Sequence, residues 1–203
     1  MLGVLLAGGQ ARRMGGGDKC LRALAGRPIV AHVIERARRQ AQALVLNANG
    51  DPARFAAFGL PVAGDVIEGF AGPLAGVLTG MEWARASRPD LPWIATIATD
   101  TPFFPPDLVA RMLDAIGREG ADLACAASAG RTHPVFGLWP VRLAPDLRQA
   151  MLDEGIRKVD VWTARHRLVE VDFATEPFDP FFNTNRPEDL DQAARLLPRL
   201  KLD

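Results

Sequence analysis

The stretch LLAGGQARRMGGGDK, residues 5–19, decides the fold, because an apolar run passes there into a glycine-rich, basic loop instead of a short turn. Its five glycines allow positive φ angles and let the backbone approach a ligand closely. Consecutive N–H groups in such turns form a concavity for phosphate oxygens. Arg13 can hold such oxygens through two parallel hydrogen bonds, and Lys19 adds a mobile positive charge. We therefore expect a loop that wraps a polyphosphate; the alternative is an ordinary solvated loop.

Short apolar runs and amphipathic stretches alternate after this loop. The apolar runs contain few polar residues, which predicts strands buried on both faces over residues 3–8, 43–48, 93–99 and 121–127. The amphipathic stretches predict helices over residues 28–40, 72–86 and 105–119. This order predicts a three-layer, Rossmann-like α/β fold, in which a mostly parallel, twisted sheet has helices on both faces.

The second half of the chain is less regular. It predicts strands over residues 132–140 and 167–173 and a closing helix over residues 186–200, and the pattern leaves their order in the sheet open. The length of 203 residues favours one domain over residues 1–203. Ligands of such sheets bind beyond the carboxyl ends of the strands, so we expect Gly8, Asn47 and Asp100 to lie in one neighbourhood.

The composition disfavours several classes of protein. Hydrophobic residues make up 48% of the chain, which supports a sizeable core and argues against disorder. Lys plus Arg number 24, as do Asp plus Glu, so no basic charge points to nucleic acid. The two cysteines are far apart, which does not indicate a disulfide framework, and we expect both to be small buried hydrophobic residues. With no signal-like or membrane-length segment, we expect a cytoplasmic protein that does not contact a membrane.

The glycine-rich loop differs from two common phosphate-binding patterns. The dinucleotide pattern G-x-G-x-x-G is absent. The P-loop pattern is also absent, because Cys20 follows Lys19 where that pattern has a hydroxyl side chain. The loop therefore predicts phosphate binding of another kind.

A carboxylate follows the predicted strand over residues 93–99. Asp100 would face the ligand crevice, and Mg²⁺ prefers one or two carboxylates together with phosphate oxygens and water. Asp100 is therefore the first candidate for a metal ligand, and the alternative is a cap of the next helix. Asp65 and Asn47 also follow strand-like pieces, but a solvated turn would explain Asp65, and the turn signal Asn-Gly-Asp explains Asn49.

Four motifs carry a likeness to a known family. They are LAGGQARRMGGGDK after the first strand, GPLAGV, TDTP after a later strand and FFNTNRPEDL near the end. In these motifs the chain resembles the molybdenum cofactor guanylyltransferases, which are nucleotidyltransferases of the glycosyltransferase-A type, over nearly its whole length. The double glycine Gly8 and Gly9 favours the guanylyl branch over the cytidylyl branch, whereas Ala11 stands where many relatives have Ser.

The resemblance implies a reaction, a fold and a set of residues. GTP and the molybdopterin cofactor would give the guanine dinucleotide cofactor and pyrophosphate, with Mg²⁺ on Asp100, on a nucleotide-diphospho-sugar transferase type of sheet. The resemblance gives catalytic roles to Arg13, Lys19 and Asp100. The positions that it implies contact the nucleotide are Leu6, Ala7, Gly8, Gly9, Lys19, Asn47, Asp65, Asp100, Asn183 and Asn185. Asn47 carries both donors and acceptors, so we expect it to read the guanine edge.

The resemblance assigns the second half of the chain to the pterin. Arg131, His133, Arg157 and Lys158 lie there, and a solvated or packed role is an equal alternative for each. The tryptophans of this half are expected in the core rather than stacked on a pterin. Transient contact with proteins that deliver the cofactor or mature molybdoenzymes also fits the family.

Other readings of the sequence stay open. One is a cytidylyltransferase for the same pterin or a nucleotidyltransferase for a sugar phosphate. Another is a nucleotide-binding module without catalysis, whose expected mark is the loss of Lys19 or Asp100; both are present. For Asn185, capping of the last helix is a sufficient alternative, whereas capping does not explain Asn183.

Overall fold

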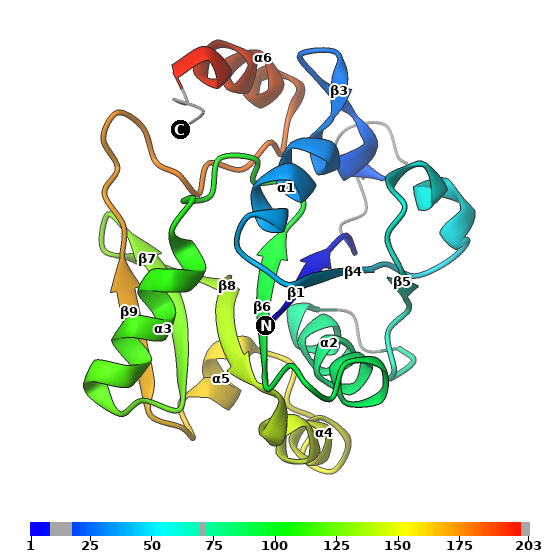
Figure 1. The fold of residues 1–203 in the computed structure, drawn as a ribbon, viewed down its shortest axis with the longest axis vertical. Coiled ribbons are helices and arrows are strands. Elements are labelled where there is room, and N and C mark those ends of the chain that lie inside the picture. Colours follow the sequence, from blue (N-terminus) through cyan, green and yellow to red (C-terminus); the bar gives the residue numbers. More distant parts are fainter. Residues whose placement is uncertain (9–17, 70–71, 200–203) are drawn as a thin grey trace.

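A computed structural model of the chain describes residues 1–8, 18–69 and 72–199 (Figure 1). Within these residues, seven strands form one sheet in the order β5-β4-β1-β6-β8-β7-β9. The strands are β1 (Leu2–Leu6), β4 (Ala43–Asn47), β5 (Val62–Ala63), β6 (Trp93–Ala98), β7 (Leu123–Ser128), β8 (Arg131–Pro140) and β9 (Leu168–Asp172). Every pairing except those of β8 is parallel, which confirms the predicted mostly parallel sheet.

Strand β8 is the exception because it returns directly from β7 through a tight turn. Ala129 and Gly130 form that turn with φ angles of 48° and 71°, a left-handed geometry that suits a two-residue hairpin. The returning strand pairs with β6 on its other side and so fills the place between β6 and β7. In Figure 1 the arrowheads of β6 and β9 point toward the same end of the molecule, which is the carboxyl end of the parallel strands.

Helices cover both faces of the sheet. On one face lie α1 (Ile29–Arg38) and α3 (Leu108–Glu119), and on the other lie α2 (Pro73–Ser87), α4 (Ala144–Leu152) and α5 (Val159–Thr163). Successive residues of a strand point to opposite faces, so Val4 packs against α2 whereas Leu5 packs on the side of α1. The predicted three layers are therefore present.

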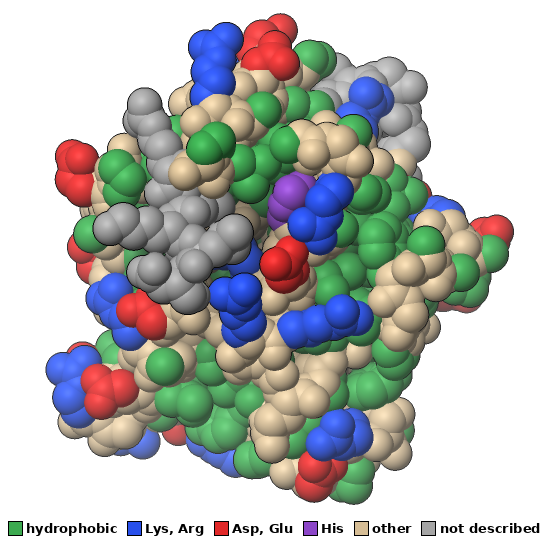
Figure 2. All heavy atoms as spheres, turned by 45° about the horizontal axis from the view of Figure 1, so that its top comes forward, with side chains coloured by type: hydrophobic (Ala, Val, Ile, Leu, Met, Phe, Trp, Pro, Cys, Tyr) green, Lys and Arg blue, Asp and Glu red, His purple; other side chains and the backbone are tan. Residues whose placement is uncertain are grey.

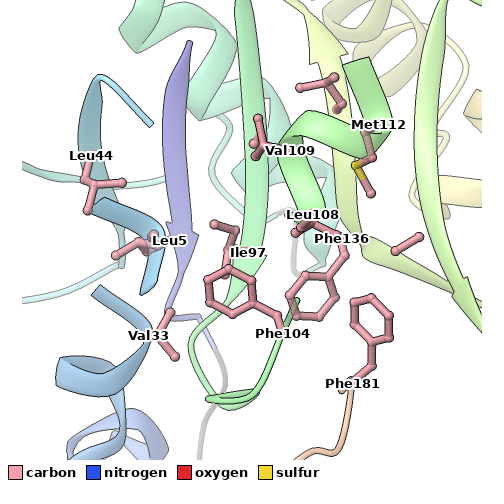
Figure 3. Close-up of a cluster of buried hydrophobic side chains, with 14 of the residues drawn as sticks. Leu5, Val33, Leu44, Ile97, Phe104, Leu108, Val109, Met112, Phe136 and Phe181 are labelled. Atoms are coloured by element: carbon pink, nitrogen blue, oxygen red, sulfur yellow. The ribbon is translucent and has the colours of Figure 1, made fainter. Parts of the chain in front are cut away.

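The core between the sheet and helices α1 and α3 reaches the C-terminal segment through aromatic rings. Figure 3 shows Phe104, Phe136 and Phe181 in a row beside the side chains of α3. Ring centroids lie 6.2 Å apart for Phe104 and Phe136 and 5.0 Å apart for Phe136 and Phe181. Because Phe181 is buried here, the residues that follow it are held over the carboxyl end of the sheet.

The core on the other face of the sheet, beside α2, α4 and α5, contains both tryptophans of the second half of the chain. Trp139 and Trp162 are fully buried, with ring centroids 6.0 Å apart. Each indole N–H has a partner at 2.8 Å, the hydroxyl of Thr96 for Trp139 and the carboxylate of Asp146 for Trp162. The expectation that these rings belong to the core is confirmed.

The remaining elements flank or connect these strands and helices. They are the ribbon of β2 (Ala23–Leu24) and β3 (Arg27–Pro28), helix α6 (Pro187–Leu196), and the short 3₁₀ helices η2 (Lys19–Leu21), η3 (Pro52–Phe58), η4 (Val141–Leu143) and η5 (Leu197–Arg199). Helix α6 packs on this ribbon, with Ala193 and Leu24 buried in one small cluster. Figure 2 shows Lys and Arg side chains interspersed with Asp and Glu side chains on the face it presents. No helix in the described part of the chain has the length and apolarity that a membrane span requires.

Two helical glycines give opposite predictions for substitution by alanine. A Cβ atom on Gly80 in α2 would lie 2.5 Å from Cγ2 of Val4 in β1, whereas a Cβ on Gly117 in α3 meets no described atom within 4 Å. We expect Gly80→Ala to lower the free energy of unfolding by about 1–3 kcal/mol through overpacking. Gly117→Ala should raise it by about 0.5–1 kcal/mol, because alanine favours the helix. Urea unfolding of both variants checks this, and equal effects would contradict the packing of α2 on β1.

Candidate functional site

A cleft of about 940 Å³ opens at the carboxyl ends of β1, β4 and β6. Residues from all three strand ends line it, together with the first turn of α2 and the short helix η2. The lining includes Leu6, Ala7, Gly8, Lys19, Cys20, Asn47, Asn49, Asp65, Gly72, Gly76, Thr99, Asp100 and Asn183. The prediction that Gly8, Asn47 and Asp100 lie in one neighbourhood is confirmed, because parallel strands end at the same edge of the sheet.

An ion pair forms the floor at one end of the cleft. Lys19 is only 8% exposed, and its Nζ lies 2.5 Å from Oδ2 of Asp100. The ammonium also donates to Oδ1 of Asn185. A buried ammonium needs such partners, since an unpaired charge out of water is costly. Within the described residues, two of its three N–H groups are engaged in these bonds, which leaves one for a ligand.

The C-terminal segment completes this end of the cleft. Thr184 donates both its backbone N–H and its hydroxyl to the carbonyl oxygen of Asp100, at 3.0 and 2.9 Å. The hydroxyl of Thr101 contacts Oδ1 of both Asp100 and Asn183. Asp100 is therefore tied to residues more than eighty positions later, and it is not a helix cap, because α3 begins at Leu108 with Asp107 at its N-cap.

The side chain of Asn185 contacts Lys19 and does not cap helix α6, which was the alternative. The backbone N–H groups of Asn185 and Arg186 both donate to Oδ2 of Asp189, at 2.7 Å each, so Asp189 satisfies the start of α6. The amide of Asn185 is thereby left to accept from Lys19. Both late asparagines lie beside the Lys19–Asp100 pair, in agreement with the resemblance of their motif.

Asp65 is held by amide groups at the other end of the cleft. Nδ2 of Asn47 donates to Oδ1 of Asp65 at 2.9 Å and to the carbonyl of Ala63 at 3.2 Å. Nδ2 of Asn49 donates to Oδ2 of Asp65 at 2.7 Å. Asn47 is 5% exposed and both of its amide hydrogens are engaged within the protein, so it cannot offer those hydrogens to a base as the sequence suggested. The half-buried carboxylate of Asp65 is the hydrogen-bonding group that this arrangement presents to the cleft.

Helix α2 approaches the strand ends closely at Gly76. A Cβ atom there would lie 2.5 Å from Oδ1 of Asn47 and 2.6 Å from Cδ2 of Leu6. Thr99 ties β1 to β6 at the same level, because its hydroxyl donates to the carbonyl of Leu6 at 2.9 Å. The backbone of Leu6 and Ala7 is thus fixed at the base of the cleft, with the N–H of Ala7 bonded to the carbonyl of Asn47 at 2.9 Å.

The described part of the structure does not place every predicted site residue in the cleft. Gly9 and Arg13 fall outside the described residues. Three cations and one imidazole are expected on the acceptor side. Of these, Arg157 lies at the cleft edge, where its backbone carbonyl oxygen comes within about 3.7 Å of a Cβ built on Gly72. His133 instead stacks on the ring of Phe181 at 4.3 Å, with Nε2 bonded to the hydroxyl of Ser128 at 2.7 Å, and burial lowers its pKa. The acceptor side remains a prediction.

Sequence reasoning missed three contributors to the site. Thr101 and Thr184 bind Asp100, and Asn49, which the turn signal explained on its own, binds Asp65. A signal for Thr101 exists in the sequence, since it directly follows Asp100 at a strand end. No local signal marks Thr184 or Asn49, because their partners are distant in the chain.

The chain has clear relatives among known proteins. A family model described as a MobA-like NTP transferase domain matches residues 3–168. A molybdenum cofactor guanylyltransferase from Rhodopseudomonas palustris strain BisB5 is 57% identical over 97% of this chain and 93% of its own length. The enzyme of that name from Bradyrhizobium sp. strain ORS 278 is 58% identical over 96% of this chain and 92% of its own length. The crystal structure of molybdopterin-guanine dinucleotide biosynthesis protein A from Archaeoglobus fulgidus shares the fold, with a TM-score of 0.75 and 23% identity over 98% of this chain and all of its own.

The two thiols give a prediction on reactivity. Burial raises the pKa of Cys20 to about 11 and that of Cys125 to about 12. Because a raised pKa keeps the thiol protonated, only about one Cys20 in a thousand is thiolate at pH 8, and the thiolate is the reactive form. We expect neither cysteine to react with a disulfide reagent at pH 8 while the chain is folded, although Cys20 borders the cleft, and both to react in urea. Labelling of the native protein at the unfolded rate would contradict this.

Proposed function

The chain belongs to the molybdenum cofactor guanylyltransferases, within the MobA-like NTP transferase family, and from this premise we propose the reaction that its cleft performs. It transfers a GMP moiety from GTP to the terminal phosphate of the molybdopterin cofactor. The products are the guanine dinucleotide cofactor and pyrophosphate. The observation that carries the proposal is the convergence of Lys19, Asp100 and Asn185 at one end of a cleft whose other end presents Asp65.

In the proposed reaction, the terminal phosphate of the pterin attacks the α-phosphorus of GTP in line and expels pyrophosphate. That phosphate is already anionic at pH 7, so the reaction needs no general base. Catalysis then consists of positioning and of neutralising charge. The third N–H of the Lys19 ammonium donates to a phosphate oxygen, and Asn185 and Asp100 hold that ammonium in place. Arg13 is proposed to act on the same triphosphate from the glycine-rich loop.

The residues around Asp100 fit a magnesium ion. Its carboxylate lines the cleft, and its Oδ1 accepts only a 3.2 Å bond from Thr101 among the described bonds, which leaves capacity for a hard cation. No group of three or more carboxylate, imidazole or thiol ligands occurs in the described residues, so the remaining ligands would be phosphate oxygens and water. Mg²⁺ on Asp100 would supply Lewis-acid neutralisation of the triphosphate.

Asp65 is proposed to select guanine. Each carboxylate oxygen has two acceptor sites, and one on each oxygen is taken by Asn47 or Asn49. The remaining site on each oxygen matches the two parallel donors of guanine, N1–H and the N2 amino group. Adenine and cytosine present an acceptor beside a donor on the same edge, so a carboxylate faces a lone pair with either base. A site with this arrangement disfavours CTP, which argues against the cytidylyl alternative.

The first prediction tests the phosphate end of the cleft. We expect Lys19→Ala and Asp100→Ala each to lower kcat on the order of a hundredfold. The first removes a positive contact to the reacting phosphates, and the second removes the proposed ligand of the magnesium ion that neutralises them. Pyrophosphate release from GTP and molybdopterin is the measurement, with circular dichroism to verify folding. Arg118→Ala serves as the control, since its exposed pair with Asp114 is remote from the cleft. Turnover near that of the unsubstituted protein in either variant would remove that residue from the mechanism.

The second prediction tests the base end. Asp65→Asn replaces two acceptors by one acceptor and one donor, so GTP binding should weaken by roughly 10- to 100-fold, the effect of losing a charged hydrogen bond. The same variant should gain affinity for xanthosine triphosphate, whose edge presents N1–H beside a carbonyl oxygen. Competition binding with GTP, ATP, CTP and xanthosine triphosphate measures both effects. An unchanged order of preference in the variant would exclude Asp65 as the reader of the base.

A further inference from the structure

We propose that Asn49 is a positioning residue for base selection: it holds the Asp65 carboxylate in the orientation in which both oxygens face the two donors of guanine. This inference rests on the proposed function. It gives a role in the site to Asn49, which the sequence had explained as part of a turn alone. It is carried by the reciprocal bonding between Asn49 and Asp65, and by the contacts that fix Asn49 itself.

Asn49 and Asp65 form a closed ring of hydrogen bonds. The amide nitrogen of Asn49 donates to Oδ2 of Asp65 at 2.7 Å, and the backbone N–H of Asp65 donates to Oδ1 of Asn49 at 2.7 Å. One side chain thereby binds both the backbone and the carboxylate of Asp65, which fixes the rotation of that carboxylate.

Asn47 holds only the other oxygen of the same carboxylate. Its Nδ2 reaches Oδ1 of Asp65 at 2.9 Å from the end of β4. With Asn49 present, a hydrogen bond holds each oxygen of the Asp65 carboxylate. Without Asn49, only the bond from Asn47 remains, and the carboxylate could rotate about its bond to Cβ. A side chain that is already held at two points loses little conformational entropy when a ligand binds. The selective part of the pair is therefore Asn49, whereas Asn47 also joins β4 to the edge strand β5 through the carbonyl of Ala63.

The backbone of Asn49 is itself tied down by Arg54. One guanidinium nitrogen of Arg54 donates to the carbonyl of Asn49 and another to the carbonyl of Asp51. The same guanidinium lies 2.6 Å from the carboxylate of Asp18, the residue before Lys19, and 4.6 Å from the ring centroid of Phe55. Gly50 takes the turn between Asn49 and Asp51 with a φ angle of +84°. Asn49 is thus a fixed support even though it lies at an exposed position.

The test compares GTP with inosine triphosphate, which keeps N1–H but lacks the N2 amino group. In Asn49→Ala we expect GTP affinity to fall about tenfold, inosine triphosphate affinity to fall about two- to threefold, and kcat at saturating GTP to change less than twofold. Asn49→Asp, measured at pH 8, has nearly the same shape but no amide donor, and should lose the same discrimination. Asp51→Asn is the control, because the Asp51 side chain accepts from the N–H of Ala53 rather than binding Asp65.

A double-substitution cycle shows whether Asn49 acts through Asp65. If it does, adding Asn49→Ala to Asp65→Asn should change GTP affinity less than twofold beyond Asp65→Asn alone, since coupled residues are not additive. Additive losses would mean that Asn49 contacts the base directly or supports the fold generally, and would overturn the proposal. Equal losses for GTP and inosine triphosphate in Asn49→Ala would overturn it as well.

The result that would contradict the proposed function differs from the result that would contradict the role of Asn49. If the unsubstituted protein shows no preference for GTP over ATP and CTP, the assignment of Asp65 and of guanylyl transfer fails before Asn49 is tested. If that preference is present and Asn49→Ala leaves it intact, only the role of Asn49 fails. Thermal midpoints of all variants, expected within a few degrees of the unsubstituted protein, separate both results from loss of folding.

Discussion

The site depends on one buried ion pair, that of the Lys19 ammonium with the Asp100 carboxylate. A charge held away from water persists only with partners, so the position of Lys19 requires Asp100 and Asn185 beside it. The pair in turn joins the end of the glycine-rich loop to the end of β6. These are the parts of the chain that a parallel sheet places at one edge, and the pair fixes the Lys19 ammonium there.

The C-terminal segment makes that pair possible from the other side. Phe181 inserts into the core beside Phe136 (Figure 3). Thr184 binds the carbonyl of Asp100 with two hydrogen bonds. The exposed asparagines that flank Thr184 are thereby placed at the cleft, where Asn183 lines the wall and Asn185 accepts from Lys19. The segment needs no regular structure for this, because a buried ring and two bonds to one carbonyl restrict its backbone sufficiently. Function at this end of the cleft therefore relies on packing well below it.

The two ends of the cleft differ in chemistry and are joined by a short path. Charge predominates at Lys19 and Asp100, whereas hydrogen-bond acceptors held by amides predominate at Asp65. Arg54 connects the two, since its guanidinium contacts Asp18 beside Lys19 and the carbonyl of Asn49 beside Asp65. A nucleotide spanning the cleft would thus have its phosphates and its base bound by parts of one connected framework.

The sequence alone determined the alternation of strands and helices, and with it the placing of Gly8, Asn47 and Asp100 at one rim. It could do so because apolar periodicity reports burial locally and because parallel strands share one carboxyl edge. Only the tertiary structure decided that β8 runs antiparallel between β6 and β7, that Asn185 contacts a lysine 166 residues earlier, and that Asn49 rather than solvent holds Asp65. Such contacts join residues whose own neighbourhoods carry no mark of the partner, since hydrogen bonds between distant side chains depend on how the chain closes and not on any local pattern.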